Sequence, residues 1–241
     1  MNEGAAVFAY DEQLAEQYPT LRAGLLHASG LTNRPSPPQL LAAYHAEQQA
    51  AAQRLQTTPA AEMPSIAAWR RVFTRFGATP TKHRSAPEAL LRRLSSHDHV
   101  PSIGTLVDIG NLVSLRYAVP VAVFDLARIR CTLTVRFATG AEQFTDLGST
   151  ASTKPGPGEV VFVDEDEVVM ARRWCWRQSA KAATGPDTTA ALFVVEAHHE
   201  TAASDVNAAL DDLTDLLATH QPGHVTARGT LSPSDQVRQW P

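Results

Sequence analysis

A single proline, Pro120, separates two parts of the chain whose apolar residues recur at different spacings. Before it, apolar side chains in residues 106–117 recur every three or four positions, as on one face of a helix. After it, residues 131–137 alternate apolar and polar side chains, as a half-buried strand does. Because proline cannot continue a helix, the helix that Thr105 and Asp108 would open must end before residue 120. The sequence therefore predicts an α+β fold that is helix-rich in its N-terminal half and strand-rich in its C-terminal half.

The length and composition suit one domain. A chain of 241 residues is long enough to bury a substantial apolar core, and its 44% hydrophobic and 19% charged residues are ordinary for a globular protein. No apolar run is long enough to cross a bilayer, and the start of the chain lacks the basic and then apolar pattern of a secretory signal. We therefore expect one domain over residues 1–220 and a cytoplasmic location. Residues 221–241, which carry Pro, Gly and Ser, are predicted to form a loose C-terminal tail.

Periodicity also predicts the other elements. Besides the helix before Pro120, helical spacing or helix-forming composition predicts helices at 39–56, 66–76, 86–94 and 203–220. Ser85 and Glu88 fit a capping box at the start of the third of these. Apolar or alternating runs predict strands at 21–28, 131–137, 160–163, 168–178 and 191–196. The strands at 160–163 and 168–178 should form a hairpin.

Cysteine and histidine spacing does not indicate a metal site. Cys131 and Cys175 lie far apart without a Cys-x-x-Cys pattern, which favours free thiols. Neighbouring histidines such as His198 and His199 lack the helical spacing that places two ligands on one metal. We expect neither a metal nor a cofactor.

Positive charge is concentrated between residues 69 and 94, although the whole chain carries a formal net charge of −4. This stretch has seven basic residues and the single acid Glu88, whereas residues 196–215 carry six acids and no Lys or Arg. A basic region on an acidic protein favours a defined phosphate-bearing partner over indiscriminate coating of nucleic acid. The alternative is a solvated helix face. The candidate RNA-binding residues are Arg70, Arg71, Arg75, Lys82 and Arg84.

The helix before Pro120 carries a row of small polar side chains. Asp108, Asn111 and Ser114 follow one another at intervals of three, so they drift slowly around the helix surface. Such a row can line one wall of a pocket. The alternative is that these side chains hydrogen-bond a neighbouring loop and do nothing else.

The stretch 172–179 is the second place where polar and aromatic residues gather. If the predicted strand continues through it, the period of two places one set of side chains on a single face: Arg172, Trp174, Trp176 and Gln178. Tryptophan faces stack on nucleobases, and arginines bind phosphate or carboxylate groups. This face is therefore a candidate pocket for the end of an RNA. In the alternative, both indoles belong to the core and the arginines to its rim.

Four ordered motifs resemble one protein family. They are Ala68-Trp69-Arg70-Arg71 with Phe76-Gly77, Ser85-x-x-Glu88-Ala89-Leu90-Leu91-x-Arg93, Val107-Asp108-x-x-Asn111-x-x-Ser114 and Arg173-Trp174-x-Trp176-Arg177-Gln178-Ser179. Together they resemble the free-standing B3/B4 domain proteins, which are similar to the editing module in the β subunit of bacterial phenylalanyl-tRNA synthetase. The resemblance covers residues 18–217, with the best-matching core at 66–200. It implies a mixed sheet with helices and a pocket between two halves.

In the synthetase, this module hydrolyses tyrosine wrongly esterified to the phenylalanine tRNA. The resemblance therefore implies an aminoacyl-tRNA deacylase that edits in trans and serves translation fidelity. Its partner would be the 3′ aminoacyl end of a tRNA, with the amino acid moiety in the pocket, and neither DNA nor a membrane is expected. The chain departs from the module at two points. Ala122 stands where the module has a histidine, and Gln178 lies in the neighbourhood of the module's pocket glutamate.

An aminoacyl ester is already activated, so an editing site needs to hold the wrong amino acid, place a water and stabilise the developing oxyanion. On this hypothesis, Asn111 and Gln178 are the candidate catalytic residues, because their amides can position water or the carbonyl. The candidate substrate-binding residues are Asp108, Ser114, Arg173, Trp174, Trp176 and Arg177. The alternative function is a non-catalytic module that binds tRNA ends, a nucleotide or an amino-acid-like small molecule. A purely structural, partner-binding protein is a third possibility.

Overall fold

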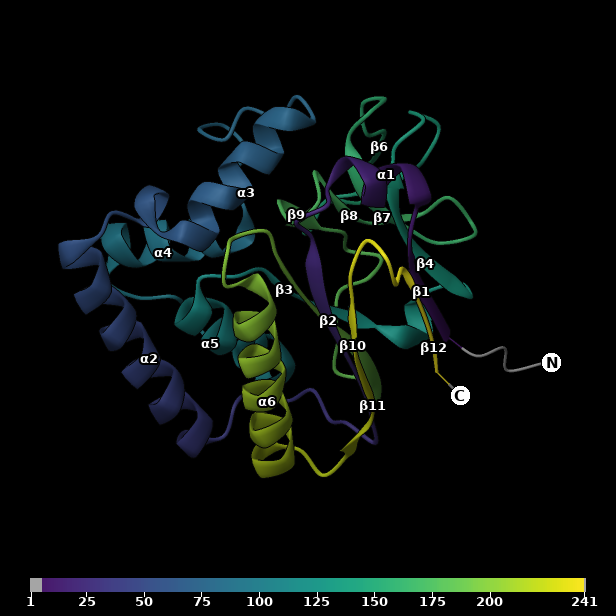
Figure 1. The fold of residues 1–241 in the computed structure, drawn as a ribbon. Helices are drawn as coiled ribbons and strands as arrows, with labels where there is room; N and C mark the ends of the chain where they lie inside the picture. The colour runs from purple at the N-terminus through teal and green to yellow at the C-terminus, as the bar shows by residue number, and fades with distance from the viewer. Residues whose placement is uncertain (1–5, 241) are drawn as a thin grey trace.

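The computed structural model describes residues 6–240, which form two large packed β-sheets and a small two-stranded sheet. The helices are α1 (Glu12–Gln17), α2 (Pro38–Thr57), α3 (Pro64–Arg75), α4 (Ala86–His97), α5 (Thr105–Tyr117) and α6 (Ala202–His220), with 3₁₀ turns at Ala60–Glu62 and Leu126–Arg128. The strands are β1 (Ala6–Tyr10), β2 (Arg22–Ser29), β3 (Val121–Asp125), β4 (Thr132–Phe137), β5 (Phe144–Thr145), β6 (Ser152–Thr153), β7 (Val160–Val163), β8 (Val169–Arg172), β9 (Arg177–Gln178), β10 (Ala190–Ala197), β11 (His224–Leu231) and β12 (Val237–Trp240). The small sheet is β5-β6. Five helices, α2 to α6, lie on the side of the four-stranded sheet, whereas α1 lies against the six-stranded sheet near β4 (Figure 1). The expectation that the chain begins without a secretory signal concerns residues 1–5, which lie outside the described residues.

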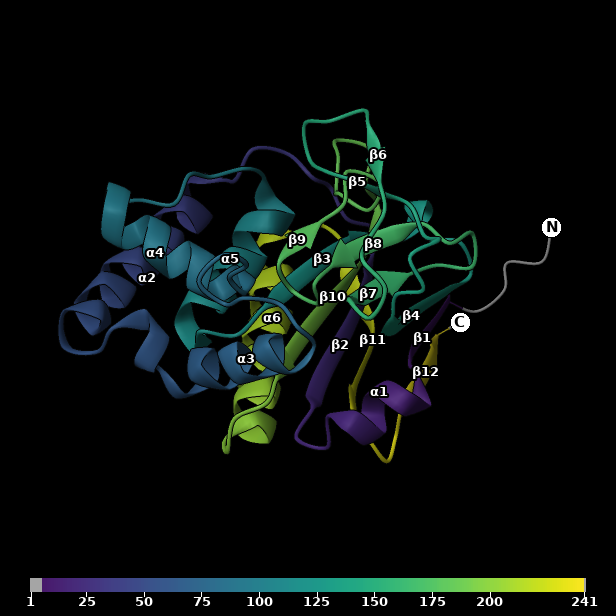
Figure 2. The ribbon, with the colours of Figure 1, turned by 90° about the horizontal axis from the view of Figure 1, so that it is seen from above.

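The four-stranded sheet has the order β11-β2-β10-β3, and its neighbouring strands are antiparallel. Helices α5 and α6 pack on one face of it, and α2 packs on the far side of α5 (Figures 1 and 2). The central strand β10 is buried on both faces. Phe193 and Val195 belong to the core under the helices, and Leu192 and Val194 to the core between the sheets. This double burial explains why residues 190–197 form a nearly continuous apolar run.

The six-stranded sheet has the order β12-β1-β4-β7-β8-β9. β1 and β4 pair in parallel, whereas the other neighbouring strands are antiparallel, so the sheet is mixed. Its inner face packs against the four-stranded sheet through aromatic contacts such as Phe162 with Phe124, whose ring centroids are 5.5 Å apart. The α+β fold with a mixed sheet is confirmed.

Helix α5 confirms the predicted helix before Pro120. It ends where Ala118 takes a left-handed conformation (φ 52°), and Pro120 then leads directly into β3. Gly110 allows the helix to lie close to that strand, since a Cβ at this position would be 3.0 Å from Cγ2 of Val123. The turn at Ala118 and the close packing of Gly110 against β3 together fix the path of the chain from α5 into β3. This path determines where Pro120, Val121 and Ala122 lie, and these residues line a pocket.

The other predicted helices are confirmed as α2, α3, α4 and α6, and the predicted strands at 21–28, 131–137, 160–163 and 191–196 as β2, β4, β7 and β10. Among the residues described, no helix combines the length and hydropathy needed to span a membrane.

The predicted capping box at Ser85 is wrong. The Ser85 side chain makes no capping hydrogen bond, and Glu88 is buried and accepts from Arg70 Nη1 at 2.7 Å and Arg92 Nε at 3.3 Å.

The prediction of a loose tail after Gln221 is also wrong. β11 pairs with β2 along seven register positions, and β12 pairs with β1 in the other sheet. The chain enters β11 through Gly223, where a Cβ would lie 2.0 Å from the carbonyl oxygen of Ser29. The open edge of β2 needs a partner for its backbone groups, and β11, with every second residue partly buried, supplies one.

Candidate active site

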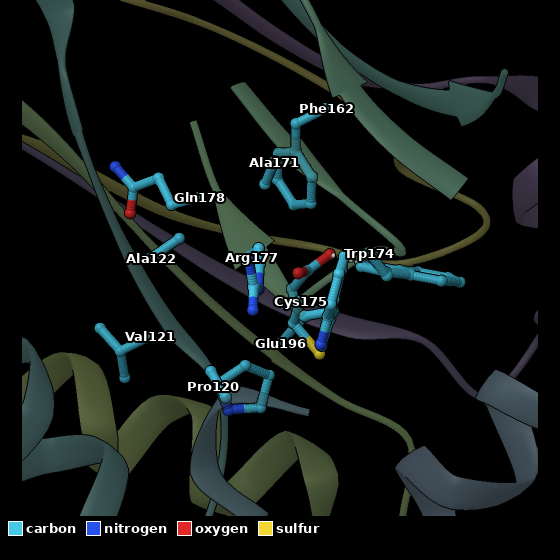
Figure 3. Close-up of a pocket in the computed structure, with 12 residues that line it drawn as sticks. Pro120, Val121, Ala122, Phe162, Ala171, Trp174, Cys175, Arg177, Gln178 and Glu196 are labelled. Atoms are coloured by element: carbon cyan, nitrogen blue, oxygen red, sulfur yellow. Dashed lines mark hydrogen bonds between the residues drawn. The ribbon is translucent and has the colours of Figure 1, made fainter. Parts of the chain in front are cut away.

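A pocket of about 420 Å³, counting the space at its mouth, lies between β3, the hairpin of β8 and β9, and β10 (Figure 3). A space of this size suits a small ligand. Most of its lining is apolar, and the polar side chains that reach it are few. The lining residues are Ala86, Pro120, Val121, Ala122, Phe162, Ala171, Trp174, Cys175, Trp176, Arg177, Gln178 and Glu196.

A tight turn decides which side chains of the hairpin face the pocket. Arg173 and Trp174 have positive φ angles of 45° and 59°, so the chain reverses there and Arg172 pairs with Arg177. The predicted continuous strand through residue 178 is therefore wrong, and so is the predicted common face, because a turn does not alternate its side chains. Trp174 is fully buried behind the pocket, whereas Trp176 is only partly buried.

Glu196, on β10, is a buried carboxylate at the inner end of this pocket. Its Oε1 accepts hydrogen bonds from the Tyr10 hydroxyl at 2.6 Å and from Trp174 Nε1 at 2.8 Å. Burial raises the pKa of Glu196 to about 7, although the two hydrogen bonds act in the opposite direction. Its Oε2 accepts no hydrogen bond from the described residues, and Figure 3 shows one carboxylate oxygen facing the open centre of the pocket.

Gln178 stands on the opposite side of the pocket, at the end of β9 (Figure 3). Its amide nitrogen donates to the carbonyl oxygens of Val123 at 2.7 Å and Ala182 at 3.2 Å. These two bonds fix the side chain against β3 and leave its carbonyl oxygen without a partner in the described part of the chain. Gln178 can therefore accept a hydrogen bond from a bound molecule, and its orientation is set before anything binds.

Glu196 was not among the residues predicted for the site. In the sequence it begins the acidic stretch 196–215, whereas the structure places it in the interior, away from the solvated acids of α6. The signal that could have identified it is its position in the apolar run of β10, where an acid is costly to bury unless it is hydrogen-bonded or functional. The pocket thus contains a glutamate, although Gln178 occupies the neighbourhood where the resemblance led us to look for one.

Cys175 also lines the pocket, and its thiol is free. Burial, followed by the charge of Glu196, raises the pKa of this thiol well above its ordinary value. The thiolate is the nucleophilic form, so Cys175 is a poor nucleophile near neutral pH. The polar chemistry of this pocket therefore rests on Glu196 and Gln178.

The polar row of α5 does not line this pocket. Asp108 is fully buried and accepts from Ser36, from Ser102 and from the backbone N–H of Ile103 at 2.9 Å, so it holds the loops before the helix. Ser114 donates to the carbonyl oxygen of Val119 at 2.7 Å. Asn111 lies beside the hydroxyl of Tyr44 on α2; burial raises the pKa of that hydroxyl, and Asn111 opposes the rise. The structure therefore does not bring Asn111 and Gln178 together.

The arginines of the hairpin gather around Trp176 at the rim. The guanidinium carbons of Arg173 and Arg177 lie 4.5 and 4.6 Å from the centroid of the Trp176 ring. Arg177 also pairs with Asp146, and Arg173 pairs with Glu159 at 2.9 Å. Of the predicted substrate-binding residues, Trp174, Trp176 and Arg177 lie at the pocket and Arg173 lies beside it.

The predicted RNA-binding residues fall into two groups. Arg70 is engaged with the buried Glu88, and Arg75 lies over the Tyr18 ring at 5.2 Å. Arg71 and Lys82 are exposed, and Arg84 is partly buried with its Nε unpaired.

Within residues 6–240, no three His, Cys, Asp or Glu side chains gather as a metal site would require.

Among solved structures, the chain is similar to an N-terminal fragment of the phenylalanyl-tRNA synthetase β subunit from Pyrococcus horikoshii, with 12% identity and a TM-score of 0.45. The alignment covers 90% of this chain and 49% of that fragment, so the chain spans about half of the fragment's length. None of the curated proteins matches the sequence. The sequence profile of the B3/4 domain matches residues 68–221, which is more than half of the chain and includes every residue that lines the pocket. The chain belongs to the B3/4 domain family.

Proposed function

We propose that this protein hydrolyses the ester of a mischarged aminoacyl-tRNA in trans, with the aminoacyl group held in the pocket between Gln178 and Glu196. Membership of the B3/4 domain family, together with the motifs that resemble free-standing B3/B4 domain proteins, supports a tRNA-linked role. The observation that carries the chemistry is the Glu196 carboxylate, which has a free oxygen and a pKa near 7 in an otherwise apolar pocket. A general base with a pKa near the working pH is the most effective kind.

In the proposed mechanism, each side chain of the pocket has one part. Phe162, Ala171 and Trp174 provide an apolar wall for the amino acid side chain. The carbonyl oxygen of Gln178 orients a water, and Oε2 of Glu196 takes a proton from it as its oxygen adds to the ester carbonyl. When the carbonyl–oxygen bond to the ribose breaks, Glu196 returns the proton to the leaving ribose oxygen. The products are a free amino acid and a tRNA with a free 3′ hydroxyl.

This mechanism compensates for one departure from the synthetase module. Ala122 lines the pocket but carries no group that could accept a proton. Glu196 supplies that group from another strand, and the small Ala122 side chain leaves room for the substrate beside it.

The test is single-turnover deacylation of a panel of mischarged tRNAs at several pH values. Glu196→Gln keeps an acceptor for Tyr10 and Trp174 but removes the base, and Gln178→Ala removes the water-orienting group. Each change should slow amino acid release by about ten- to a thousandfold, the usual effect of losing one such interaction in a transition state. The wild-type rate should rise about tenfold per pH unit below pH 7 and level off above it, because Glu196 acts when ionised.

Asn111→Ala is the matched control, since Asn111 belongs to the α5–α2 contact and should leave the rate unchanged. Circular dichroism checks that each variant is folded. If Asn111→Ala slows release and Glu196→Gln does not, the site is on α5 and the proposed mechanism is wrong. If wild type releases no amino acid above the spontaneous rate but binds tRNA, a nucleotide or an amino acid tightly, the protein is a non-catalytic binding module.

A further inference from the structure

A second cavity lies next to the hairpin turn, at Arg173. It has about 700 Å³ of space, counting its open mouth, and lies between the loop after α3 and the turn that begins at Arg173. The polar side chains that line it are Lys82, His83, Glu159 and Arg173, with Thr79 at its edge. We call it the Lys82 cavity.

Cations outnumber carboxylates around the Lys82 cavity. Arg172 binds both oxygens of Glu159, at 2.8 and 3.1 Å, and Arg173 binds Oε1 of the same carboxylate at 2.9 Å. One glutamate is thus shared by two guanidinium groups. Lys82 is exposed and makes no ion pair with any described residue. The cavity therefore presents about two positive charges that no carboxylate balances.

His83 adds a titratable ring to the lining of the same cavity. Its Nδ1 is buried and has no hydrogen-bond partner in the described part of the chain. Burial first, and then the charges of Arg173 and Lys82, lower the pKa of His83; Glu159 opposes this effect and Arg172 adds to it. The charges of Arg173, Lys82 and Arg172 thus disfavour the protonated ring, and an anion bound in the cavity would offset them.

Trp176 connects this cavity with the pocket. Its indole lines the pocket, while His83 packs edge-on against the same ring at 4.8 Å between centroids and Arg173 lies over it at 4.5 Å. The backbone N–H of Ala86 also donates to the carbonyl oxygen of Cys175 at 2.8 Å, which ties the loop after His83 to the turn. A ligand that spans this ring would place one end in the pocket and the other among the cations.

We propose that the Lys82 cavity is a phosphate-binding site that holds a phosphodiester of the RNA whose terminal aminoacyl nucleotide occupies the pocket. Phosphate oxygens suit a lysine, a free guanidinium edge and an imidazole together. The identification of the phosphate as part of RNA rests on the proposed function, whereas the affinity of the cavity for phosphate does not. The site then sets how far the ester reaches into the pocket.

The first experiment tests phosphate binding without any catalysis. The ring resonances of His83 are followed by NMR as a function of pH, with and without inorganic phosphate, in wild type and in Lys82→Gln. A phosphate dianion beside the imidazole should raise the pKa of His83 in wild type, because it favours the charged ring against Arg172, Arg173 and Lys82. The rise should be much smaller in Lys82→Gln. A His83 pKa that phosphate leaves unchanged in wild type would overturn the proposal.

The second experiment identifies the source of the phosphate. Dissociation constants are measured for an RNA minihelix ending in CCA, for AMP and for adenosine. Lys82→Gln and Arg173→Gln should each weaken minihelix binding about tenfold and lower the slope of log affinity against log salt by about one, leaving adenosine binding unchanged. Arg228→Gln, an arginine on the distant edge strand β11, is the control and should change neither value. If AMP binds as tightly as the minihelix, the ligand is a free nucleotide and the assignment to RNA is wrong. If wild type binds phosphate in this cavity but releases no amino acid from any mischarged tRNA, only the proposed function is refuted.

Discussion

Glu196 shows how one residue can combine a cost in stability with a use in chemistry. It is an acid within an apolar strand, buried between two sheets, and it is tolerated because Tyr10 and Trp174 donate to it. Burial also raises the pKa of the Tyr10 hydroxyl well above its ordinary value, so Tyr10 remains a donor. His198, two residues further along the same chain segment, is buried as well, and its pKa is lowered to about 3, mainly by desolvation. The two groups respond to pH in opposite directions.

The pH dependence of unfolding should expose this opposition. The folded pKa of Glu196, about 7, lies above its ordinary 4.5, so its contribution to stability decreases as pH rises from 4.5 to 7. The folded pKa of His198, about 3, lies below its ordinary 6.5, so its contribution is lost as pH falls below 6.5. Each group changes the free energy of unfolding by about 1.4 kcal/mol per pH unit, with opposite signs, so the two changes should cancel between pH 4.5 and 6.5. In Glu196→Gln, only the His198 slope remains.

Urea denaturation at intervals between pH 4.5 and 7.5 measures this. Relative to wild type, Glu196→Gln should lose free energy of unfolding as pH falls from 6.5, and His198→Gln should gain it. Parallel curves for all three proteins would mean that neither group is perturbed as described.

At the scale of the element, α5 explains which part of the site could be predicted from the sequence. The helix and its end at Pro120 follow from spacing, but the direction of its polar row does not. Apolar residues of α5 are buried on several sides, including Ile109, Leu112 and Val113. A helix that is apolar nearly all round offers no pattern to say which neighbour each side faces. The row contacts the loops before the helix through Asp108, α2 through Asn111 and the turn after the helix through Ser114. Gln178 and Trp176 could be predicted because their motif lies in the hairpin that itself lines the pocket.

The turn at 173–176 limits prediction in a different way. Positive φ angles at Arg173 and Trp174 are unusual for residues other than glycine, asparagine and aspartate, so no local signal marks a tight turn there. The burial of Trp174 against Trp69 and Tyr18, at 5.3 and 5.0 Å between ring centroids, offsets the local cost. Such an exchange between local strain and distant packing cannot be seen from neighbouring residues alone.

The contact between β2 and α6 gives a prediction at the same scale. Gly24 faces α6 so closely that a Cβ would lie 2.8 Å from both Cγ of Leu210 and Cγ1 of Val206. Gly24→Ala should therefore lower the free energy of unfolding by about 1–3 kcal/mol through overpacking. Leu210→Ala should cost about 2–5 kcal/mol by leaving a cavity. Because the added methyl occupies part of that cavity, the double variant should lose less free energy of unfolding than the two single variants together. Chemical denaturation of wild type, both single variants and the double variant measures this. Strict additivity would show that the two residues are not in contact.

At the scale of the whole molecule, the two sheets are each completed by the last residues of the chain. β11 joins one sheet and β12 the other, so the C-terminal segment that composition marked as loose connects both layers. Composition failed here because most of the Pro, Gly and Ser residues occupy the turns around these strands, while the strands themselves have modest hydrophobicity. What places them is the edge of β2 and the edge of β1, and pairing over such a long separation in sequence leaves no local trace.

Gly223→Ala tests this arrangement. A Cβ there would collide with the backbone of Ser29 and Gly30, so β11 could not dock in its present register. We expect a loss of several kcal/mol in the free energy of unfolding, as for a severe steric clash in a packed region, measured by thermal and urea denaturation. The next residue provides the control, because the His224 side chain is exposed and His224→Ala should be nearly neutral. Equal stability of the two variants would mean that the segment after Gln221 is loose after all.

The pairing of β1 with β12 also determines how the molecule resists force. Ala6 lies opposite Trp240 in an antiparallel ladder, and β12 is the outermost strand of its sheet. Tension applied between these two residues loads the ladder from its open end, so its hydrogen bonds break pair by pair. β1 is held more firmly because its other edge pairs with β4 in parallel. Under mechanical load, β12 should therefore peel away at low force, while the pocket, on the far strands of both sheets, keeps its shape.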